Sequence, residues 1–591
     1  HCVTRRQRQM CIRDRLNMLQ TTKKKDVQVV ITGQETKVIR SRTWNRLKFE
    51  VEYSLRKGTT ANSYLIQADK TAVIDPPGES FTQNYLESLQ IRLDWHRLDY
   101  VILGHFNTNR GATLKALLAL APSVTFVCSN PCVLNLKDYL KEEDLKIKVI
   151  KGEDTIDLGS GHQLQLITTP TPKWPDGLMT YDPKTQILFT DKFFGSHVCG
   201  DQVGDEGWSF YSEDRRFYYD CLHAAQAKQT LSTLEKISEL TVKFYAPGHG
   251  PMVRYGMMEL TNLYRKWSQE QSSRDLNVAL LYASAYGNTA TVAQAIARGL
   301  TKAGVAVESI NCEVATSNEI REVVEKCDGF IIGSPTLGGH APTQIQTALG
   351  IVLNTASKDK LAGVFGSFGW SGEAIDFLES RLKDTGYKFG FEPIRVKFKP
   401  DDVMIQTCKE AGIDFAQALI KSQQRRSPRA SVRGSGSDRT AQAMGRVVGS
   451  LCVMSAKRGN VTSAMLASWV SQATFNPPGV TVAVAKDRAL ESLTHTGDKF
   501  VLNILAEEKK NLQRYFLKPF APGEDRFTGV ETKEANNGCP ILTDALAYLE
   551  CIVANRMECG DHWLVYAVVE NGQLLNDGVT AVHFRKTGIH Y

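Results

Sequence analysis

The spacing of apolar residues changes twice along this chain of 591 residues, and no single core can accommodate all three patterns. Residues 48–267 contain short apolar strands separated by Gly and Pro turns, as in Phe49–Ser54 and Thr71–Asp75. Residues 277–421 alternate strictly between strand and amphipathic helix, which indicates a doubly wound parallel sheet. After residue 444 short strands return, and an all-β barrel is expected. The sequence therefore predicts a multidomain α/β chain.

Domain boundaries follow from these changes of pattern. A segment at 422–440, rich in Ser, Gly and Arg, is expected to be a flexible linker. Residues 5–15 match one reading frame of a common transposase sequencing adapter, so residues 1–25 are interpreted as an adapter-derived or disordered tail. The native N-terminus looks truncated, and a targeting peptide is not assessable. Three folded domains are expected, at residues 40–270, 276–421 and 441–591.

Charge and cysteine usage exclude several classes of protein. The formal net charge is +7, but residues 1–15 contribute +4 and residues 421–440 contribute +5, which leaves the remaining chain at about −2. A nucleic-acid groove requires positive charge on a folded face, so no nucleic-acid partner is expected. No long uninterrupted apolar run is present, so no membrane span is predicted. Thirteen cysteines without a Cys-x-x-Cys pair indicate reduced thiols in a cytoplasmic protein.

The first strand of the middle domain ends in the strongest chemical signal of the sequence. This apolar strand, Asn277–Ala283, leads into hydroxyl, glycine and amide residues and then into a helix expected at Ala290–Gly304. Backbone N–H groups in such a loop, together with the helix dipole, bind phosphate. Strands at Phe330–Gly333 and Leu361–Ser367 end in similar loops, and open α/β sheets bind ligands at these carboxyl ends. The candidate binding residues are Ser284, Tyr286, Gly287, Asn288, Thr289, Ser334, Pro335, Thr336, Leu337, Gly338, Ser367, Phe368, Gly369, Trp370 and Gly372.

These three loops resemble the phosphate loop and the two ring-flanking loops of flavodoxins. The resemblance implies FMN as the cofactor, with Trp370 on or beside the isoalloxazine ring. The alternative is a receiver-like α/β domain whose glycine turns bind no ligand. A dinucleotide-binding fold is disfavoured because no Gly-x-Gly-x-x-Gly follows the first strand.

In the first domain, Gly104–Gly111 follows an apolar strand and resembles the His-x-Glu-x-Asp-His metal loop of flavodiiron proteins, which have a metallo-β-lactamase-like αββα fold. Three later segments match that family at compatible spacing. In the family these positions supply four His and three carboxylate ligands to a pair of iron ions. The resemblance implies that this chain keeps three ligands, His105, Asp191 and His249. The other positions hold Asn107 and Asn109 in place of carboxylates, and Arg110 and Lys173 in place of His.

These replacements change what the pocket can bind. Asn coordinates metals weakly, and Arg and Lys cannot coordinate them at neutral pH. A pair of ferrous ions against three carboxylates would leave about one positive charge, and so do Arg110 and Lys173 against Asp191. We therefore predict that the basic side chains replace the charge of the metals, that Asp191 pairs with one or both, and that no diiron centre binds. The alternatives are a single zinc or iron ion on the three remaining ligands, or a purely structural role for them.

The last domain begins at Met444 with segments that resemble the flavin reductase family, among them Val461–Ala473, Gly560–His562 and Ala581–Lys586. The resemblance implies a split β-barrel, a second flavin (FMN or FAD) and hydride from NAD(P)H. Hydroxyl and amide residues at strand ends are the candidates to hold this flavin, namely Ser463, Ser468, Ser471 and Gln472. The alternatives are a barrel that binds no flavin, since such residues are usually turns or caps, and electrons supplied by a ferredoxin-like carrier.

Taken in this order, the three domains resemble the cyanobacterial-type (class C) flavodiiron proteins with a fused flavin reductase domain, and in particular the paralogues with a degenerate diiron site. The resemblance implies electron flow from NAD(P)H or a reduced carrier through FMN to O2, which is reduced to water. This reaction serves photoprotection, and we expect it in the cytoplasm near thylakoids. The family also implies a head-to-tail dimer in which the FMN of one subunit faces the metal site of the other.

The lost ligands favour one assembly over another. A homodimer of this chain would present each FMN to a metal-free pocket, whereas a heterodimer with a ligand-complete flavodiiron paralogue would place FMN against a working diiron site. We therefore expect an electron-delivering subunit of a heteromeric O2 reductase. The alternatives are a stand-alone NAD(P)H:flavin/O2 oxidoreductase that produces peroxide or superoxide, and a regulatory subunit whose basic pocket binds an anion.

Overall fold

The computed structural model describes residues 25–44, 48–49, 53–54, 57–142, 144–152, 154–426 and 435–585. The tail interpreted as adapter-derived lies, except for Lys25, outside these residues. The chain divides into two compact units, His1–Ser272 and Ser273–Tyr591, each of which has its own architecture. Within the described ranges, no helix combines the length and the apolar character needed to cross a lipid bilayer.

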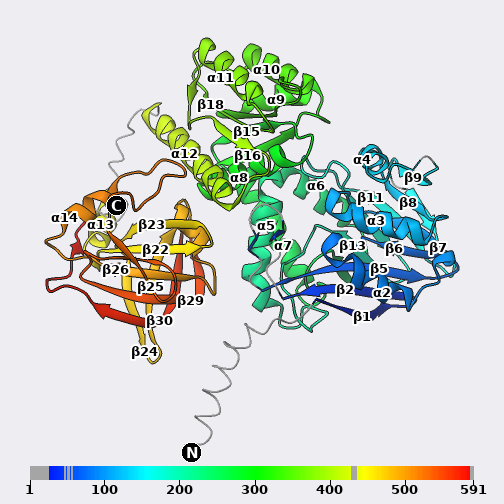
Figure 1. Cartoon of the computed structure of the whole chain (residues 1–591), viewed down its shortest axis with the longest axis horizontal. Helices are drawn as coiled ribbons and strands as arrows, with labels where there is room; N and C mark the ends of the chain where they lie inside the picture. The colour runs from blue at the N-terminus through cyan, green and yellow to red at the C-terminus, as the bar shows by residue number, and fades with distance from the viewer. Residues whose placement is uncertain are drawn as a thin grey trace, which may run out of the picture. The chain divides into compact units, whose positions relative to one another are not determined.

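Two β-sheets form the centre of the first unit (Figure 1). The larger sheet has the strand order β1-β2-β5-β6-β7-β8-β9 and the smaller one the order β10-β11-β12-β13-β14. The larger sheet is antiparallel as far as β6 and parallel from β6 to β9. The strands are β1 (Asp26–Gly33), β2 (Thr36–Thr43), β5 (Thr59–Gln67), β6 (Thr71–Ile74), β7 (Leu98–Ile102), β8 (Thr125–Ser129), β9 (Ile147–Ile150), β10 (Asp154–Asp157), β11 (Gln163–Thr168), β12 (Leu178–Asp182), β13 (Ile187–Asp191) and β14 (Phe244–Pro247).

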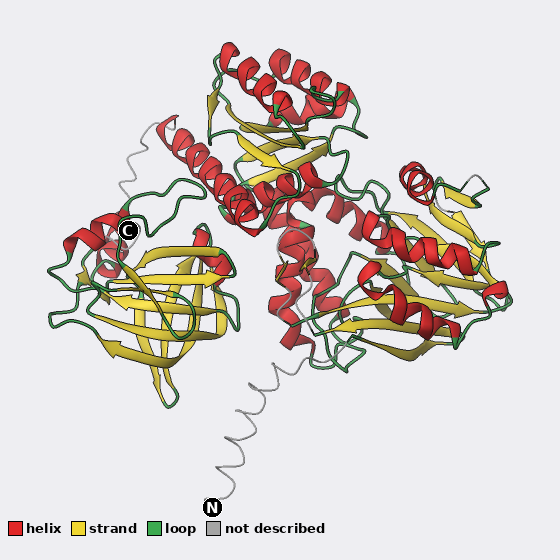
Figure 2. Cartoon of the chain, viewed as in Figure 1, coloured by secondary structure: helices red, strands yellow, loops and turns green. Residues whose placement is uncertain are grey.

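Helices cover the outer faces of both sheets, so the unit is a four-layer αββα sandwich (Figure 2). Leu65 and Leu114 belong to the apolar layer between the larger sheet and its helices, and Leu188 and Leu234 to the layer on the smaller sheet. Phe189 lies in a third apolar layer between the sheets. This confirms the predicted metallo-β-lactamase-like fold. The helices are η2 (Glu79–Phe81), α2 (Thr82–Gln90), η3 (Trp95–Arg97), α3 (Thr108–Leu120), α4 (Asn130–Leu140), η4 (Trp208–Tyr211), α5 (Ser212–Leu222), η5 (Ala224–Gln226), α6 (Ala227–Ile237) and α7 (Met257–Ser272).

The prediction of one strand in this unit is wrong. Instead of a continuous strand at Phe49–Ser54, the structure has two short strands, β3 (Lys48–Phe49) and β4 (Tyr53–Ser54). They pair antiparallel, with Phe49 opposite Tyr53. An extended strand cannot bring these two residues together, because residues four apart in a strand lie more than 10 Å from each other by the usual rise of about 3.3 Å per residue.

The second unit begins with a parallel sheet of order β16-β15-β17-β18, and both β19 and β20 pair with β18. Helices α9, α10 and α11 bury Ile320, Ile345 and Leu378 against one face, and α8 and α12 lie on the other (Figure 1). This confirms the flavodoxin-like, doubly wound prediction. The elements are β15 (Asn277–Tyr282), α8 (Asn288–Lys302), β16 (Ala306–Asn311), α9 (Ser317–Lys326), β17 (Gly329–Pro335), α10 (Thr343–Thr355), β18 (Leu361–Phe368), α11 (Glu373–Thr385), β19 (Lys388–Phe389), β20 (Ile394–Lys397) and α12 (Asp402–Arg426).

An antiparallel barrel sheet of order β23-β22-β26-β29-β30-β25-β24 completes the unit and confirms the flavin-reductase-like prediction. Its interior contains Met454, Val482 and Phe500. The elements are α13 (Ser435–Met444), β21 (Gly449–Ser450), β22 (Cys452–Arg458), β23 (Val461–Ala467), β24 (Val470–Phe475), β25 (Pro478–Ala485), η6 (Ala489–Leu493), β26 (Lys499–Ile504), α14 (Lys510–Leu517), β27 (Thr532–Glu534), β28 (Pro540–Leu542), β29 (Ala547–Cys559), β30 (His562–Leu574) and β31 (Val582–His583).

The segment expected to be a linker, 422–440, is partly helical. Helix α12 continues to Arg426, and α13 starts at Ser435. Residues 427–434 lie outside the described part of the chain. Lys, Gln and Arg are frequent at 421–426, and their good helix propensity accounts for the extension of α12.

Candidate functional site

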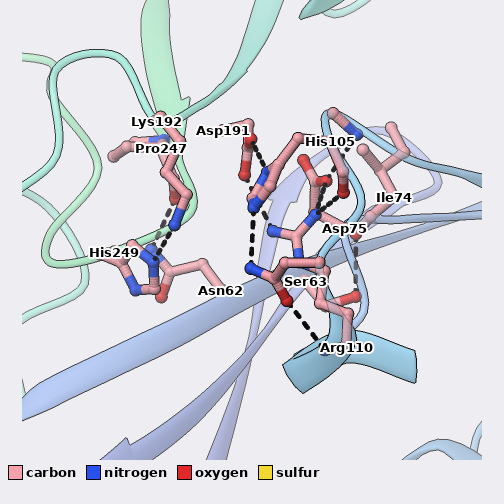
Figure 3. Close-up of polar contacts among 12 residues, drawn as sticks. Asn62, Ser63, Ile74, Asp75, His105, Arg110, Asp191, Lys192, Pro247 and His249 are labelled. Carbon is pink, nitrogen blue, oxygen red and sulfur yellow. Dashed lines mark hydrogen bonds and ion pairs between the residues drawn. The ribbon is translucent and has the colours of Figure 1, made fainter. Parts of the chain in front are cut away.

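A buried guanidinium occupies the centre of the first candidate site (Figure 3). The Arg110 side chain donates from Nη1 to Asp75 Oδ1 and from Nη2 to Asp191 Oδ1, both at 2.9 Å. Nη1 also donates to the His105 carbonyl at 2.9 Å. Strand β7 and helix α3 bring Arg110 here, because the helix begins at Thr108, within the metal-like segment, with Asn107 as its N-cap. The predicted pair between Arg110 and Asp191 is therefore present.

His105 is hydrogen-bonded at both ring nitrogens. Its Nδ1 bonds to Asp191 Oδ2, and its Nε2 lies 3.2 Å from Asn107 Nδ2. Burial lowers the pKa of His105 to about 4, which favours a neutral ring that donates from Nδ1 and accepts the Asn107 amide at Nε2. Burial raises the pKa of Asp191, but the charge of Arg110 and the hydrogen bond from His105 lower it by a larger amount, so this carboxylate stays ionised. The His105 ring nitrogens and the Asp191 carboxylate, which a metal would need as ligands, are thus hydrogen-bonded to other side chains.

His249 is satisfied in the same manner. Its Nδ1 donates to the Thr60 carbonyl at 2.7 Å, and its Nε2 lies 3.3 Å from Lys192 Nζ (Figure 3). Burial lowers the pKa of His249 well below its usual value, and the neighbouring Lys192 lowers it further. A neutral His249 therefore accepts from the lysine at the nitrogen that remains available.

Sequence reasoning missed Asp75 and Lys192. Asp75 directly follows β6, which is parallel to β7, so both strands end at the same edge of the sheet. Burial and the neighbouring Asp191 raise the pKa of Asp75 to about 7, and Arg110 opposes that rise. An acidic residue at the end of a buried parallel strand was the signal for Asp75. For Lys192 the signal was its place directly after the ligand-like Asp191.

The two remaining replaced positions, Asn109 and Lys173, have different surroundings. Asn109 is exposed and its side chain lies beside Gly78. Lys173 Nζ is 4.6 Å from the centroid of the Trp174 ring, and Lys192 Nζ is 5.8 Å from the same centroid. We refer to the residues gathered here as the basic pocket, which consists of Asp75, His105, Arg110, Lys173, Asp191, Lys192 and His249.

The donor set of the basic pocket does not fit a diiron centre. Both histidines use their Nε2 atoms to accept hydrogen bonds, and a guanidinium lies between the two carboxylates. Within the described ranges, no three His, Cys, Asp or Glu side chains are grouped to hold a metal ion. A cation placed beside Arg110 and Lys192 would also be repelled strongly in so buried a place.

The second candidate site is the carboxyl edge of the flavodoxin-like sheet, where the structure brings together the three predicted loops at 284–289, 334–338 and 367–372, called here the carboxyl-edge loops. Thr289 Oγ1 and Ser367 Oγ are 2.8 Å apart, which joins the first loop to the third. The Thr336 N–H donates to the Ser367 carbonyl at 2.9 Å, which joins the second to the third. Three loops that are far apart in sequence therefore form one surface.

These loops fit an FMN. Gly287 has φ +80° at the N-cap of α8, where an added Cβ would meet open space, so its backbone can approach a phosphate closely. Gly338 has φ +57° and also faces open space. Tyr286 and Trp370 are 85% and 91% exposed, so both rings are free to stack on a planar ligand.

Not every predicted residue of these loops faces outward. The Ser334 hydroxyl is buried and donates to the Pro335 carbonyl at 2.8 Å, and Ser284 Oγ accepts from the Ala290 N–H at 3.0 Å. Phe368 is half-buried and packs against the apolar core of the domain. Their role is to hold the loops in shape.

The four residues predicted for the reductase flavin lie on different parts of the barrel. Ser463 is buried within β23, and its hydroxyl has no hydrogen-bond partner within the described residues. Ser471 and Gln472 are exposed on β24, and Ser468 is buried between these strands. Sequence reasoning assigned no role to Trp469, whose ring centroid is 4.9 Å from both the His562 ring centroid and the Arg585 guanidinium. This aromatic and basic cluster forms a rim beside Ser468.

Comparisons with known proteins match each part of the chain. Residues 59–250 match the ODP family beta lactamase, residues 280–412 match flavodoxin, and residues 444–588 match the flavin reductase like domain. The Flv1 flavodiiron core of Synechocystis sp. PCC6803, solved after metal soaking, is 61% identical, covers 68% of this chain and 100% of its own, and has a TM-score of 0.66.

Two full-length relatives cover nearly the whole chain. A protein of Nostoc sp. PCC 7120 assigned as diflavin flavoprotein A 6 is 65% identical over 96% of this chain and 100% of its own length. Diflavin flavoprotein A 1 of Synechocystis sp. PCC 6803 is 43% identical over 96% of this chain and 98% of its own length. The chain therefore belongs to the cyanobacterial diflavin flavoproteins A, flavodiiron-family oxidoreductases in which a lactamase-like, a flavodoxin and a flavin reductase domain are fused.

Proposed function

We propose that this chain is the metal-poor, electron-delivering subunit of a heteromeric flavodiiron O2 reductase. It accepts electrons from NAD(P)H or a reduced protein carrier, passes them through flavin, and delivers them to a ligand-complete paralogue that reduces O2 to water. The observation that carries this proposal is the contrast between two sites. The basic pocket has satisfied its carboxylates and imidazoles internally, whereas the carboxyl-edge loops keep an open surface suited to FMN.

The residues of the carboxyl-edge loops have distinct roles in this proposal. When bound, FMN supplies the capacity to accept hydride equivalents and to release electrons singly. The N-terminus of α8 and Gly287 would hold its phosphate, and the exposed rings of Tyr286 and Trp370 would contact its ring. The bond between Thr289 and Ser367 fixes the distance between the phosphate-side loop and the ring-side loop.

A second flavin and NAD(P)H belong to the barrel in this proposal. The match to the flavin reductase like domain over residues 444–588 supports it, as does the rim of Trp469, His562 and Arg585. We place the reaction in the cytoplasm near thylakoids, where it relieves over-reduction, and this placement rests on the family and on the thirteen cysteines without a Cys-x-x-Cys pair.

The iron-to-flavin ratio of the chain purified alone from iron-replete medium tests the proposal. We expect iron near zero with flavin near two per chain, as a basic pocket of this kind repels cations. After mixing with a ligand-complete paralogue, the chain should consume O2 without forming peroxide. Adding catalase to the assay reveals whether peroxide has formed. Iron near two per chain would refute the metal-poor role. Rapid peroxide formation by the chain alone, unaltered by the paralogue, would instead favour the stand-alone flavin oxidoreductase.

A further inference from the structure

A buried ionic cluster joins the flavodoxin-like and flavin-reductase-like parts of the second unit. Lys302, the last residue of α8, places its Nζ 2.6 Å from Glu491 Oε2. Arg556 of β29 places Nη1 3.0 Å from Glu491 Oε1, and its guanidinium lies 4.1 Å from the centroid of the Trp563 ring. The side chains of Lys302, Glu491 and Arg556 are 8%, 3% and 3% exposed, so this cluster is shielded from solvent.

Glu491 needs cations from both domains to remain charged. Burial raises the pKa of this carboxyl, but the charges of Lys302, Arg556 and Arg298 lower it by a larger amount. The net pKa of Glu491 is therefore below its usual value. Arg556 belongs to the barrel, whereas Lys302 and Arg298 belong to α8. Without the α8 cations, the buried Glu491 carboxylate would have only the positive charge of Arg556 beside it. A buried charge that is incompletely paired is unfavourable.

Helix α12 adds a second line of contacts to the same part of the barrel. Gln406 Nε2 donates to the Ala489 carbonyl at 3.3 Å, and the Ser492 hydroxyl donates to Gln406 Oε1 at 3.1 Å. Glu410 Oε2 accepts from the Gly523 N–H at 2.9 Å, and Glu410 Oε1 lies 3.3 Å from Arg526 Nη2. These contacts involve η6 and the loop at 521–526.

A close helix crossing holds α8 and α12 side by side beneath the barrel contacts. A Cβ added to Gly299 of α8 would lie 2.0 Å from the Lys409 carbonyl oxygen, and one added to Gly412 of α12 would lie 2.2 Å from the Ile296 carbonyl oxygen. Only glycine permits this approach of two backbones. The crossing therefore makes one continuous platform of Arg298, Lys302, Gln406 and Glu410.

We infer that this platform is the docking site of the flavin reductase domain within its own chain, with Glu491 as the central residue of the interface. The platform lies at the C-terminal end of α8. The phosphate loop lies at the other end, about 22 Å away for a helix of this length. Tyr286 and Trp370 remain exposed while the reductase is docked, so docking leaves the carboxyl-edge loops uncovered for a separate redox partner.

Hydrogen–deuterium exchange of the full chain tests the docking site with Lys302→Glu, which sets a carboxylate against Glu491. We expect amides at 487–493 and 521–526 to exchange about tenfold faster or more, since local opening exposes them. Strands β29 and β30 should keep their protection, FMN content should not change, and small-angle scattering should show a larger maximum dimension. Lys302→Met should have the same effect in smaller measure.

The matched control is Lys326→Glu, because Lys326 forms an exposed pair with Glu322 on α9, which lies on the opposite face of the sheet from α8 and α12. It should leave exchange and scattering unchanged. Unaltered exchange in Lys302→Glu would overturn the inference. So would loss of protection throughout β29 and β30, which would assign Glu491 to the folding of the barrel itself. The iron-to-flavin ratio does not depend on either result, so this test fails independently of the proposed function.

Discussion

In the first unit, the polar side chains at the ends of β6, β7 and β13 bond to one another, whereas in the second unit the loops at the ends of β15, β17 and β18 expose rings and glycines to a ligand. Both regions occupy the carboxyl ends of parallel strands, where enzymes of α/β architecture place their sites. In the basic pocket Arg110 lies between two carboxylates, whereas Gly287 and Gly338 of the carboxyl-edge loops face open space. The same topological position is thus filled by paired charges in one unit and left open in the other.

Removing the Arg110 guanidinium should have the largest effect on the difference between the two regions, because it destabilises the first unit alone. Arg110→Ala leaves Asp75 and Asp191 buried next to each other, and we expect a loss of about 3–5 kcal/mol in the stability of the first unit. The control is Arg395→Ala, because Arg395 also pairs with two carboxylates, Asp376 and Glu379, but is 40% exposed and should cost less than about 1 kcal/mol. Urea-dependent hydrogen exchange of peptides from β7 and α3, or from β20 and α11 for the control, gives both values. Equal losses in the two variants would show that the buried network contributes no special stability.

Acid should separate the two regions next. The buried His223 ring lies 4.5 Å from the Phe193 ring, and burial lowers its pKa from 6.5 to about 3. Between these values the unfolded chain binds a proton that the folded chain refuses, so stability falls as pH falls. The slope for this residue is about 1.4 kcal/mol per pH unit. The flavodoxin-like domain contains one histidine, the exposed His340, so no buried histidine contributes such a slope there.

Denaturation between pH 7 and pH 4 measures this difference, with His223→Gln as the variant that cannot titrate. Its stability should decline less steeply with acid than that of the unaltered chain, whatever its stability at pH 7. An identical pH slope for both chains would mean that His223 is protonated as readily in the folded state as in the unfolded one.

FMN binding should depend on the exposed ring of the carboxyl-edge loops. Trp370→Ala removes a stacking surface that is 91% exposed, and we expect FMN to bind about tenfold more weakly. Stability without FMN should change by less than about 0.5 kcal/mol, because the ring has little burial to lose. Fluorescence titration of the flavin-free chain measures the affinity, and Phe210→Ala, which removes an 84% exposed ring from the first unit, is the control. If both variants bind FMN equally well, Trp370 does not contact the flavin.

The smallest expected effect concerns Asn107, the residue that caps the N-terminus of α3. Asn107 Oδ1 accepts the Arg110 N–H at 2.9 Å as the N-cap of α3. Asn107→Ala should reduce stability by about 1 kcal/mol, while Asn107→Asp should retain the cap. Chemical denaturation of both variants distinguishes a capping role from a ligand role. Iron binding by Asn107→Asp alone would contradict our view that Arg110 and Lys192 exclude metal.

Prediction from sequence succeeded where a feature depends on residues close together in the chain. The glycine and hydroxyl loop at 284–289 follows an apolar strand and precedes an amphipathic helix, so its place at a sheet edge could be predicted. The replacement of ligands by Asn107, Asn109, Arg110 and Lys173 rests on a resemblance of short segments and stays a prediction. Where the residues of a feature are neighbours in the sequence, the periodicity of the strand or helix defines their relative positions.

Other features were missed because their partners are distant in sequence. The positions of Asp75 and Lys192 at strand ends hinted at a site, but nothing in the sequence identifies Arg110 and His249 as their partners, or Lys302 as the partner of Glu491. The linker was predicted too long because its composition is mixed, and the ends of helices in such segments depend on small differences of propensity.

By itself, the sequence determined three kinds of sheet and the place of three glycine and hydroxyl loops at one sheet edge. Tertiary structure alone decided that a carboxylate from β6 and another from β13 would hold Arg110, and that a barrel carboxylate would join α8. The physical reason is that a buried charge is stable only beside an opposite charge in good geometry, and strand ends supply that geometry irrespective of distance along the chain.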